Sequence, residues 1–179
     1  MQAIDLTSQM SRVAHEAAAT VLGQRGILRT LKGEHAEILT LLRGCERTHD
    51  NPRGLTKRRS IFEKIRAQLL SHLETEEGEL YAALANVSET SGRVERDRRQ
   101  HATIEGLVER LSLLDSATPA WMESCRELYE ACSRHAEEEE DELFPLALRH
   151  LGAEELDEMD RRYRRERQQR MMALERELH

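Results

Sequence analysis

Apolar residues recur every three to four positions along most of the chain, a period that predicts amphipathic helices rather than strands. Glycine, proline and polar clusters divide this pattern into a leading helix near residues 5–22, four long helices near 28–47, 55–84, 94–114 and 119–147, and a charged helix after Gly152. Short connections make neighbouring helices antiparallel. We therefore predict an all-α fold, an up-down-up-down four-helix bundle built from two tandem helical hairpins, residues 31–84 and 98–147, with an extra N-terminal and C-terminal helix.

Length and composition agree with one helical domain. The chain has 179 residues, 34% of them charged and only 3% aromatic, which suits long surface-charged helices around one core. We divide it into an N-terminal helical extension (1–26), the bundle (27–151) and a charged C-terminal helix (152–179). The last helix has a thin apolar stripe, which we interpret as a packing element or as the contact of a homodimer.

Charge and cysteine usage exclude several classes of protein. A net charge of -7 argues against nucleic-acid binding, and no apolar run approaches the length of a membrane span. The first residues lack the basic and apolar regions of a secretion signal, and three cysteines do not form a disulfide framework. We expect a cytoplasmic protein with neither a nucleic-acid nor a membrane partner.

A histidine interrupts the apolar stripe of each of the four long helices, and two of these histidines begin a His-x-x-x-Glu motif. The residues concerned are His35, His72 with Glu76, His101, and His135 with Glu139. Side chains four residues apart lie on one helix face, about 6 Å apart along the axis, so each motif can present two ligands to one centre. Imidazoles and carboxylates on facing helices form binuclear transition-metal sites.

The alternative is that these histidines are ordinary polar residues and that the acidic runs around 74–79 and 137–142 are solvated faces. Four coinciding stripes argue against it, because several buried imidazoles and carboxylates without a cation are costly. The same stripes continue past the motifs, so we expect Ala83, Glu142 and Leu146 to face the core as well. Pro145 should kink the fourth long helix near its acidic run.

On these residues the chain resembles the hemerythrin-like family, the HHE cation-binding domain, over about residues 28–150. Lone histidines alternate with His-x-x-x-Glu motifs, which are followed by Glu-Leu-Tyr and Glu-Leu-Phe-Pro. The resemblance implies two iron ions with an oxo or hydroxo bridge. It places His35 and His72 on one ion, His101 and His135 on the other, and Glu76 and Glu139 as bridges between them. Manganese or zinc can substitute for iron.

Two positions depart from the oxygen-carrying members of the family. The resemblance to oxygen-carrying members would place a His-x-x-x-His motif on the third helix. In this chain Glu105 takes the place of the second histidine of that motif, and it is either a seventh ligand or a solvent-facing acid beside the ligands. The same members resemble a pattern in which an acid follows the last histidine by five residues, a position that Glu140 holds here. The four-residue spacing favours Glu139 instead. Because of the departure at Glu105, we discount oxygen transport.

The expected reactants are peroxide, dioxygen or nitric oxide. Our preferred interpretation is a non-haem di-iron protein of oxidative stress, which would be a catalase-like oxidoreductase if it is an enzyme. The alternatives are a dioxygen or nitric oxide sensing module, and iron storage or delivery for the repair of iron centres.

Two cysteines form a separate hypothesis. Cys45 and Cys125 each lie about 15 Å along the helix axis from the histidine of their own helix, and in antiparallel helices these displacements point the same way. They can therefore meet as a thiol pair, or be two small buried side chains.

Overall fold

The computed structural model describes residues 25–47 and 54–177, which form helices and no strand. The leading helix expected near residues 5–22 lies outside these residues. The helices are α2 (Gly26–Glu46), α3 (Gly54–Glu76), η1 (Glu77–Tyr81), α4 (Ala82–Leu84), α5 (Ser91–Leu113), α6 (Pro119–Glu138), η2 (Glu139–Leu143), α7 (Phe144–His150) and α8 (Ala153–Glu177). The prediction of an all-α fold is confirmed for this part of the chain.

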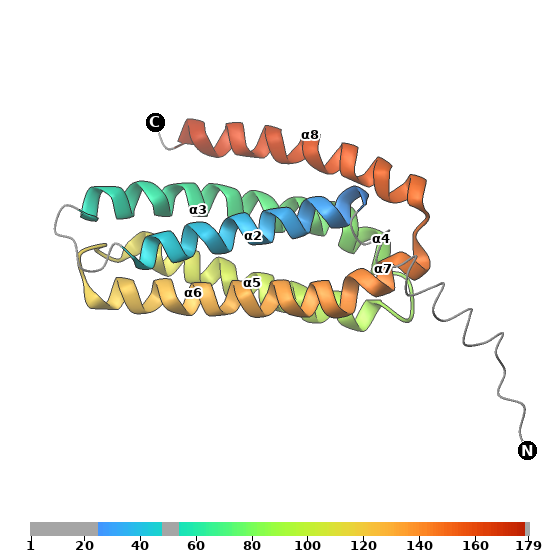
Figure 1. Ribbon diagram of the computed structural model, residues 1–179, viewed down its shortest axis with the longest axis horizontal. Helices are drawn as coiled ribbons and strands as arrows, with labels where there is room; N and C mark the ends of the chain where they lie inside the picture. Colours follow the sequence, from blue (N-terminus) through green and yellow to red (C-terminus); the bar gives the residue numbers. More distant parts are fainter. Residues whose placement is uncertain (1–24, 48–53, 178–179) are drawn as a thin grey trace, which may run out of the picture.

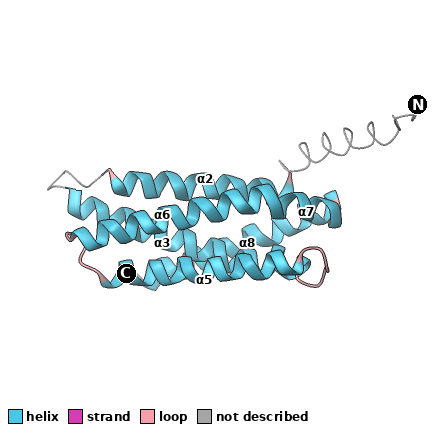
Figure 2. Ribbon diagram, turned by 90° about the horizontal axis from the view of Figure 1, so that it is seen from below, coloured by secondary structure: helices cyan, strands magenta, loops and turns pink. Residues whose placement is uncertain are grey.

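Four long helices, α2, α3, α5 and α6, lie along the long axis of the molecule (Figures 1 and 2). Helix α2 packs against α3 and α6, and α5 packs against α6. The fifth long helix, α8, lies along α2 and α3 on the outside of this group. In the first half of its apolar stripe, Leu156, Met159 and Tyr163 are buried. This part of the stripe packs on its own chain, while a homodimer through α8 stays a prediction.

Local sequence explains two of the helix starts. Thr118 caps α6 by accepting a hydrogen bond from the Trp121 N–H, and Pro119 is the first residue of the helix. Gly26 opens α2 with a φ of 56°, where a side chain would lie 2.6 Å from the Leu156 carbonyl oxygen of α8. Only glycine fits this close approach without strain.

The buried apolar residues form two clusters, and the predicted metal ligands lie between them along the helices. On α2, Ile27 and Leu31 of one cluster precede His35, whereas Ile38 and Leu42 of the other follow it. Helix α5 repeats this order, with Val94 before His101 and Ile104 after it, and α3 and α6 show the reverse order about His72 and His135. A layer of buried polar side chains therefore separates two apolar halves of the core.

Both helices with a His-x-x-x-Glu motif contain a π turn at its glutamate. These turns are η1, directly after Glu76, and η2, which begins at Glu139. Single π turns inside α-helices are frequent at functional sites. A π turn holds one residue more than an α turn, so it shifts the buried face of everything that follows by one position.

This shift corrects the predicted register. Leu84, Leu143 and Ala147 are buried, each one residue later than the position that α-helical spacing indicates. Of the predicted residues, Glu142 is exposed, and Ala83 and Leu146 are half-buried. The expected irregularity near the acidic run is present just before Pro145, and the equivalent turn η1, which contains no proline, shows that proline is not required for such a turn.

Among the described helices, none has an apolar stretch long enough to cross a membrane.

Candidate metal centre

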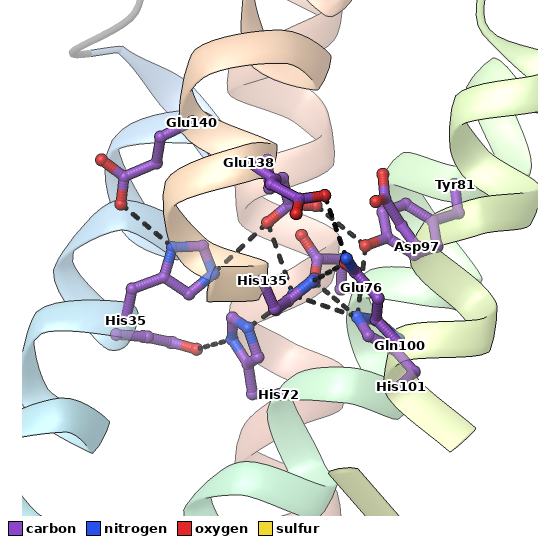
Figure 3. Close-up of polar contacts among 12 residues, drawn as sticks. His35, His72, Glu76, Tyr81, Asp97, Gln100, His101, His135, Glu138 and Glu140 are labelled. Carbon is purple, nitrogen blue, oxygen red and sulfur yellow. Dashed lines mark hydrogen bonds and ion pairs between the residues drawn. The ribbon is translucent and has the colours of Figure 1, made fainter. Parts of the chain in front are cut away.

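Six predicted ligands meet in the polar layer. The four histidines come from α2, α3, α5 and α6, one from each helix, and the two glutamates end α3 and begin η2 (Figure 3). The side chains are at most 5% exposed, and those of Glu76 and Glu139 are fully buried. The residues are His35, His72, Glu76, His101, His135 and Glu139. Helices distant in sequence therefore bring the two repeated motifs to one point.

The ligand atoms lie at distances that suit a shared cation. One ligand atom from each of His35, His72, Glu76 and His135 lies within 4.8 Å of the others. His101 joins this group through its Nε2 atom, which lies 3.2 Å from His135 Nε2 and 3.6 Å from Glu76 Oε2. Glu139 Oε2 lies 3.3 Å from His35 Nε2 and 3.9 Å from His135 Nε2.

Each imidazole turns its Nδ1 atom away from the centre, toward a partner. His35 Nδ1 lies 3.1 Å from Glu140 Oε1, and His101 Nδ1 lies 2.9 Å from Glu77 Oε1. Each of these two carboxylates follows a ligand glutamate in the sequence. An Nδ1–H that donates to such an acceptor leaves the Nε2 lone pair free to bind a metal, a usual arrangement for metal-binding histidines.

The other two histidines are held by the residue that precedes each lone histidine. His72 Nδ1 lies 3.0 Å from Glu34 Oε2, and His135 Nδ1 lies 3.2 Å from Gln100 Oε1. The two hairpins therefore repeat the outer contacts as well as the ligands. They differ in charge, because one partner is a carboxylate and the other an amide.

Aromatic rings cover two of the imidazoles at equivalent positions of the two repeats. The Tyr81 ring stacks on His101, and the Phe144 ring stacks on His35. Tyr81 is fully buried, and its hydroxyl donates a hydrogen bond of 2.9 Å to Glu139 Oε1. Burial, together with the charge of Glu76, holds the Tyr81 pKa well above its usual value, so the phenol keeps its proton.

The pKa shifts follow from burial and from the two ligand carboxylates. Burial lowers the pKa of His72 to about 4 and that of His135 well below its usual value, so both imidazoles are neutral and able to bind a metal. Burial and the charge of Glu139 raise the pKa of Glu76 well above its usual value. The Glu139 pKa is lowered, because contacts with His35 and His135 outweigh its burial.

Several inward atoms have no hydrogen-bond partner within the described part of the chain. They are His35 Nε2, His72 Nε2, both carboxylate oxygens of Glu76, and Glu139 Oε2. Burying an unpaired carboxylate costs about several kcal/mol. The two Nε2 lone pairs of His101 and His135 also face each other at 3.2 Å. Two imidazole nitrogens that bind one ion at about 2.1 Å lie about 3 Å apart, so metal ions fit both observations.

Two acids that sequence alone left open lie away from this centre. Glu105 is on the exposed face of α5, beside Glu74 and Arg170, so the structure does not bring it to the other six residues. Glu140 turns toward His35 Nδ1 and Lys32 rather than inward. The choice of Glu139 over Glu140 agrees with this geometry.

The outer partners of the histidines were not predicted as site residues. Glu34, Glu77 and Gln100 are direct sequence neighbours of the ligands, which is the signal that could have found them. Tyr163 of α8 also contacts the site, with its hydroxyl 3.1 Å from His72 Nδ1. No signal near the ligands indicates this contact, because it depends on how the last helix docks.

Cys45 on α2 and Cys125 on α6 are buried in the same apolar cluster. The neighbouring Cys125 thiol lowers the pKa of Cys45, and the Cys45 thiol together with burial raises the pKa of Cys125. The two thiols are thus neighbours in the core, while a redox role for them stays a prediction. Cys132 is buried near His135, and burial raises its pKa to about 12.

Comparison with known protein families identified a match over most of the described chain. The family model described as the hemerythrin HHE cation binding domain matches residues 26–147. The matched range begins with α2 and ends within α7, and it contains all six converging ligands. Neither the curated proteins nor the solved structures contain a significant match to the chain.

Proposed function

The chain belongs to the hemerythrin HHE cation-binding family. We propose that its buried centre holds two iron ions and reacts with a small oxidant, for which peroxide is our preferred candidate. His35 and His72 would hold one ion, His101 and His135 the other, and Glu76 and Glu139 would bridge them. The four long helices would form the up-down-up-down bundle expected from sequence. Manganese or zinc would fit the same donors as substitutes.

One observation carries this proposal: five inward atoms of His35, His72, Glu76 and Glu139 have no hydrogen-bond partner among the described residues, while all four histidine Nδ1 atoms do. Such a donor set is preorganised for cations and is costly without them. An iron pair would supply the oxidation and reduction that no described side chain of the centre supplies. The protein would hold the pair in a dry core between two apolar clusters.

The His101 half is the better candidate for the reactive side. Tyr81 distinguishes the two halves, because its hydroxyl lies 3.2 Å from His101 Nε2. Neither lone histidine has a further ligand four residues on, since Glu105 faces solvent and Leu39 cannot bind a metal. The role of the Tyr81 hydroxyl would be to keep a proton beside the reacting molecule, with Glu139 Oε1 as the acceptor that orients it.

Oxygen evolution from peroxide by the iron-loaded protein tests this function. We expect turnover in the native protein and its loss in His101→Ala. A stable oxy or nitrosyl spectrum without turnover would instead support the sensing alternative. Iron released to an apo-acceptor without turnover would support delivery.

A further inference from the structure

Three polar side chains converge on one oxygen atom beside the centre. The Oε2 atom of Glu34 accepts a hydrogen bond from the Tyr163 hydroxyl at 2.6 Å, forms an ion pair with Arg167 Nε at 2.9 Å, and lies 3.0 Å from His72 Nδ1. Such charge-assisted contacts are about twice as strong as neutral ones. The position of the Glu34 carboxylate is therefore fixed by α8 on one side and by a metal-binding imidazole on the other.

Both α8 residues lie beyond the end of the family match at residue 147. Tyr163 is fully buried against the bundle, whereas Arg167 is at the edge of the contact with 19% of its side chain exposed. The contact is thus formed by a helix added to the family domain and reaches a histidine inside that domain.

The equivalent contact of the second hairpin is different. His135 Nδ1 faces the amide oxygen of Gln100, whose own amide donates to Glu138 Oε2 at 3.0 Å. Among the described residues, α8 provides no tyrosine or arginine to this pair. A carboxylate that accepts the imidazole N–H increases the basicity of the opposite nitrogen more than a neutral amide does, and such outer contacts change metal affinity by about 10–100-fold.

We propose that Tyr163 and Arg167 are positioning residues that hold Glu34 against His72, so that α8 makes the two metal positions unequal. The position served by His35 and His72 binds its ion more tightly and fills first. The position served by His101 and His135 fills second. This inference rests on the proposed binuclear centre and specifies how that centre is loaded.

Stepwise titration of the metal-free full-length chain with Co²⁺ tests the inference, because the visible absorption of this ion reports each binding step. The native protein should bind two ions in two resolved steps. Tyr163→Phe keeps the ring and removes the hydroxyl, and Glu34→Gln copies the amide of the other half. Each should weaken the first step about tenfold or more and leave the second within about twofold.

Three controls separate positioning from folding. Arg167→Lys keeps a positive charge and should retain most of the first-step affinity that Arg167→Leu loses. Tyr129→Phe removes a hydroxyl that accepts from Arg43 elsewhere in the bundle, and it should change neither step. Thermal unfolding in chelator measures the stability of each variant without metal.

The outcomes distinguish the two claims. Two bound ions with indistinguishable affinities in the native protein, or variants that weaken both steps equally, would overturn the inference and leave the proposed centre intact. Variants that lower only the metal-free stability would show a structural role and also overturn it. A native protein that takes up no Co²⁺ would contradict the proposed function, and the inference with it.

Discussion

The phenol ring of Tyr81 stacks on the imidazole of His101, with ring centroids 5.0 Å apart and planes 24° from parallel. At the equivalent place in the other repeat, Phe144 stacks on His35, with centroids 6.3 Å apart and planes at 11°. The two halves of the centre therefore share an aromatic cover, but only one cover carries a hydroxyl.

Tyr81→Phe should separate the hydroxyl from the ring. The stacking and the ligands remain, whereas the proton donor beside His101 is lost. We expect peroxide turnover to fall about 10²-fold, the lower range for a general acid, with two iron ions still bound. Oxygen evolution and iron content measure the two effects. Unchanged turnover would exclude the proposed role of the hydroxyl, and Tyr129→Phe is the control for removing a tyrosine hydroxyl elsewhere.

The pH dependence of the metal-free protein should follow His35. Burial alone would lower its pKa, but the carboxylates of Glu139 and Glu140 outweigh burial and raise the pKa from 6.5 to about 9. Protonated His35 therefore stabilises the metal-free fold fully below pH 6.5, and this contribution is lost as the pH rises through about 9. The loss should be on the order of a few kcal/mol.

Urea unfolding in chelator between pH 6 and 9.5 measures this loss. Metal binding must displace the same proton, so the apparent Co²⁺ affinity should rise with pH over this range, by up to about tenfold per unit. The His35→Gln variant should lose less stability than the native protein between pH 6 and 9.5, because it lacks the imidazole that loses its proton over this range. A native protein whose stability does not change over this range would contradict the assignment.

Gly26 is the next test, because its backbone conformation and its close contact with α8 both require glycine. Gly26→Ala should lower the free energy of unfolding by at least about 1–2 kcal/mol, the cost of a left-handed conformation, with the clash at Leu156 added to it. Gly33→Ala is the matched control: it is exposed on the same helix with no atom within 4 Å. There alanine should stabilise by about 0.5–1 kcal/mol. Equal effects in a denaturant titration would contradict the packing of α8.

The thiol pair provides a redox prediction. One peroxide molecule should oxidise Cys45 and Cys125 to a disulfide, the two thiols giving up two protons and two electrons and the peroxide becoming two water molecules. Mass spectrometry after thiol labelling should then find one free thiol, that of Cys132, and Cys132→Ser should leave the disulfide unaffected. Three labelled thiols after peroxide treatment would show that the pair is only a packing contact.

Sequence periodicity predicted the ligands because each lies where α-helical spacing still holds. His72 and Glu76 are on one stripe up to the end of α3, and His135 and Glu139 are related in the same way. Beyond these residues the same reasoning placed Glu142 toward the core, although η2 turns it outward to Arg93 and Arg96. A π turn depends on local hydrogen bonding that the apolar pattern does not encode.

Some of the residues that contact the histidine Nδ1 atoms could be found from sequence, and others could not. Glu77 and Glu140 follow the ligand glutamates directly, so a search of the sequence neighbours would have found them. The contact of Tyr163 with Glu34 joins α8 to α2, and only the docking of α8 reveals it. Sequence left Glu105 open as either a seventh ligand or a solvent-facing acid, and in the structure this residue is exposed on α5.

Iron content per chain, measured after anaerobic reconstitution and removal of free metal, tests the central claim most directly. We expect two iron ions in the native protein, at most one in His101→Ala, and two in His150→Ala, whose histidine pairs with Glu89 and is not among the converging ligands. A native protein that retains no iron, or that retains as much iron after His101→Ala as before, would contradict a binuclear centre at these residues.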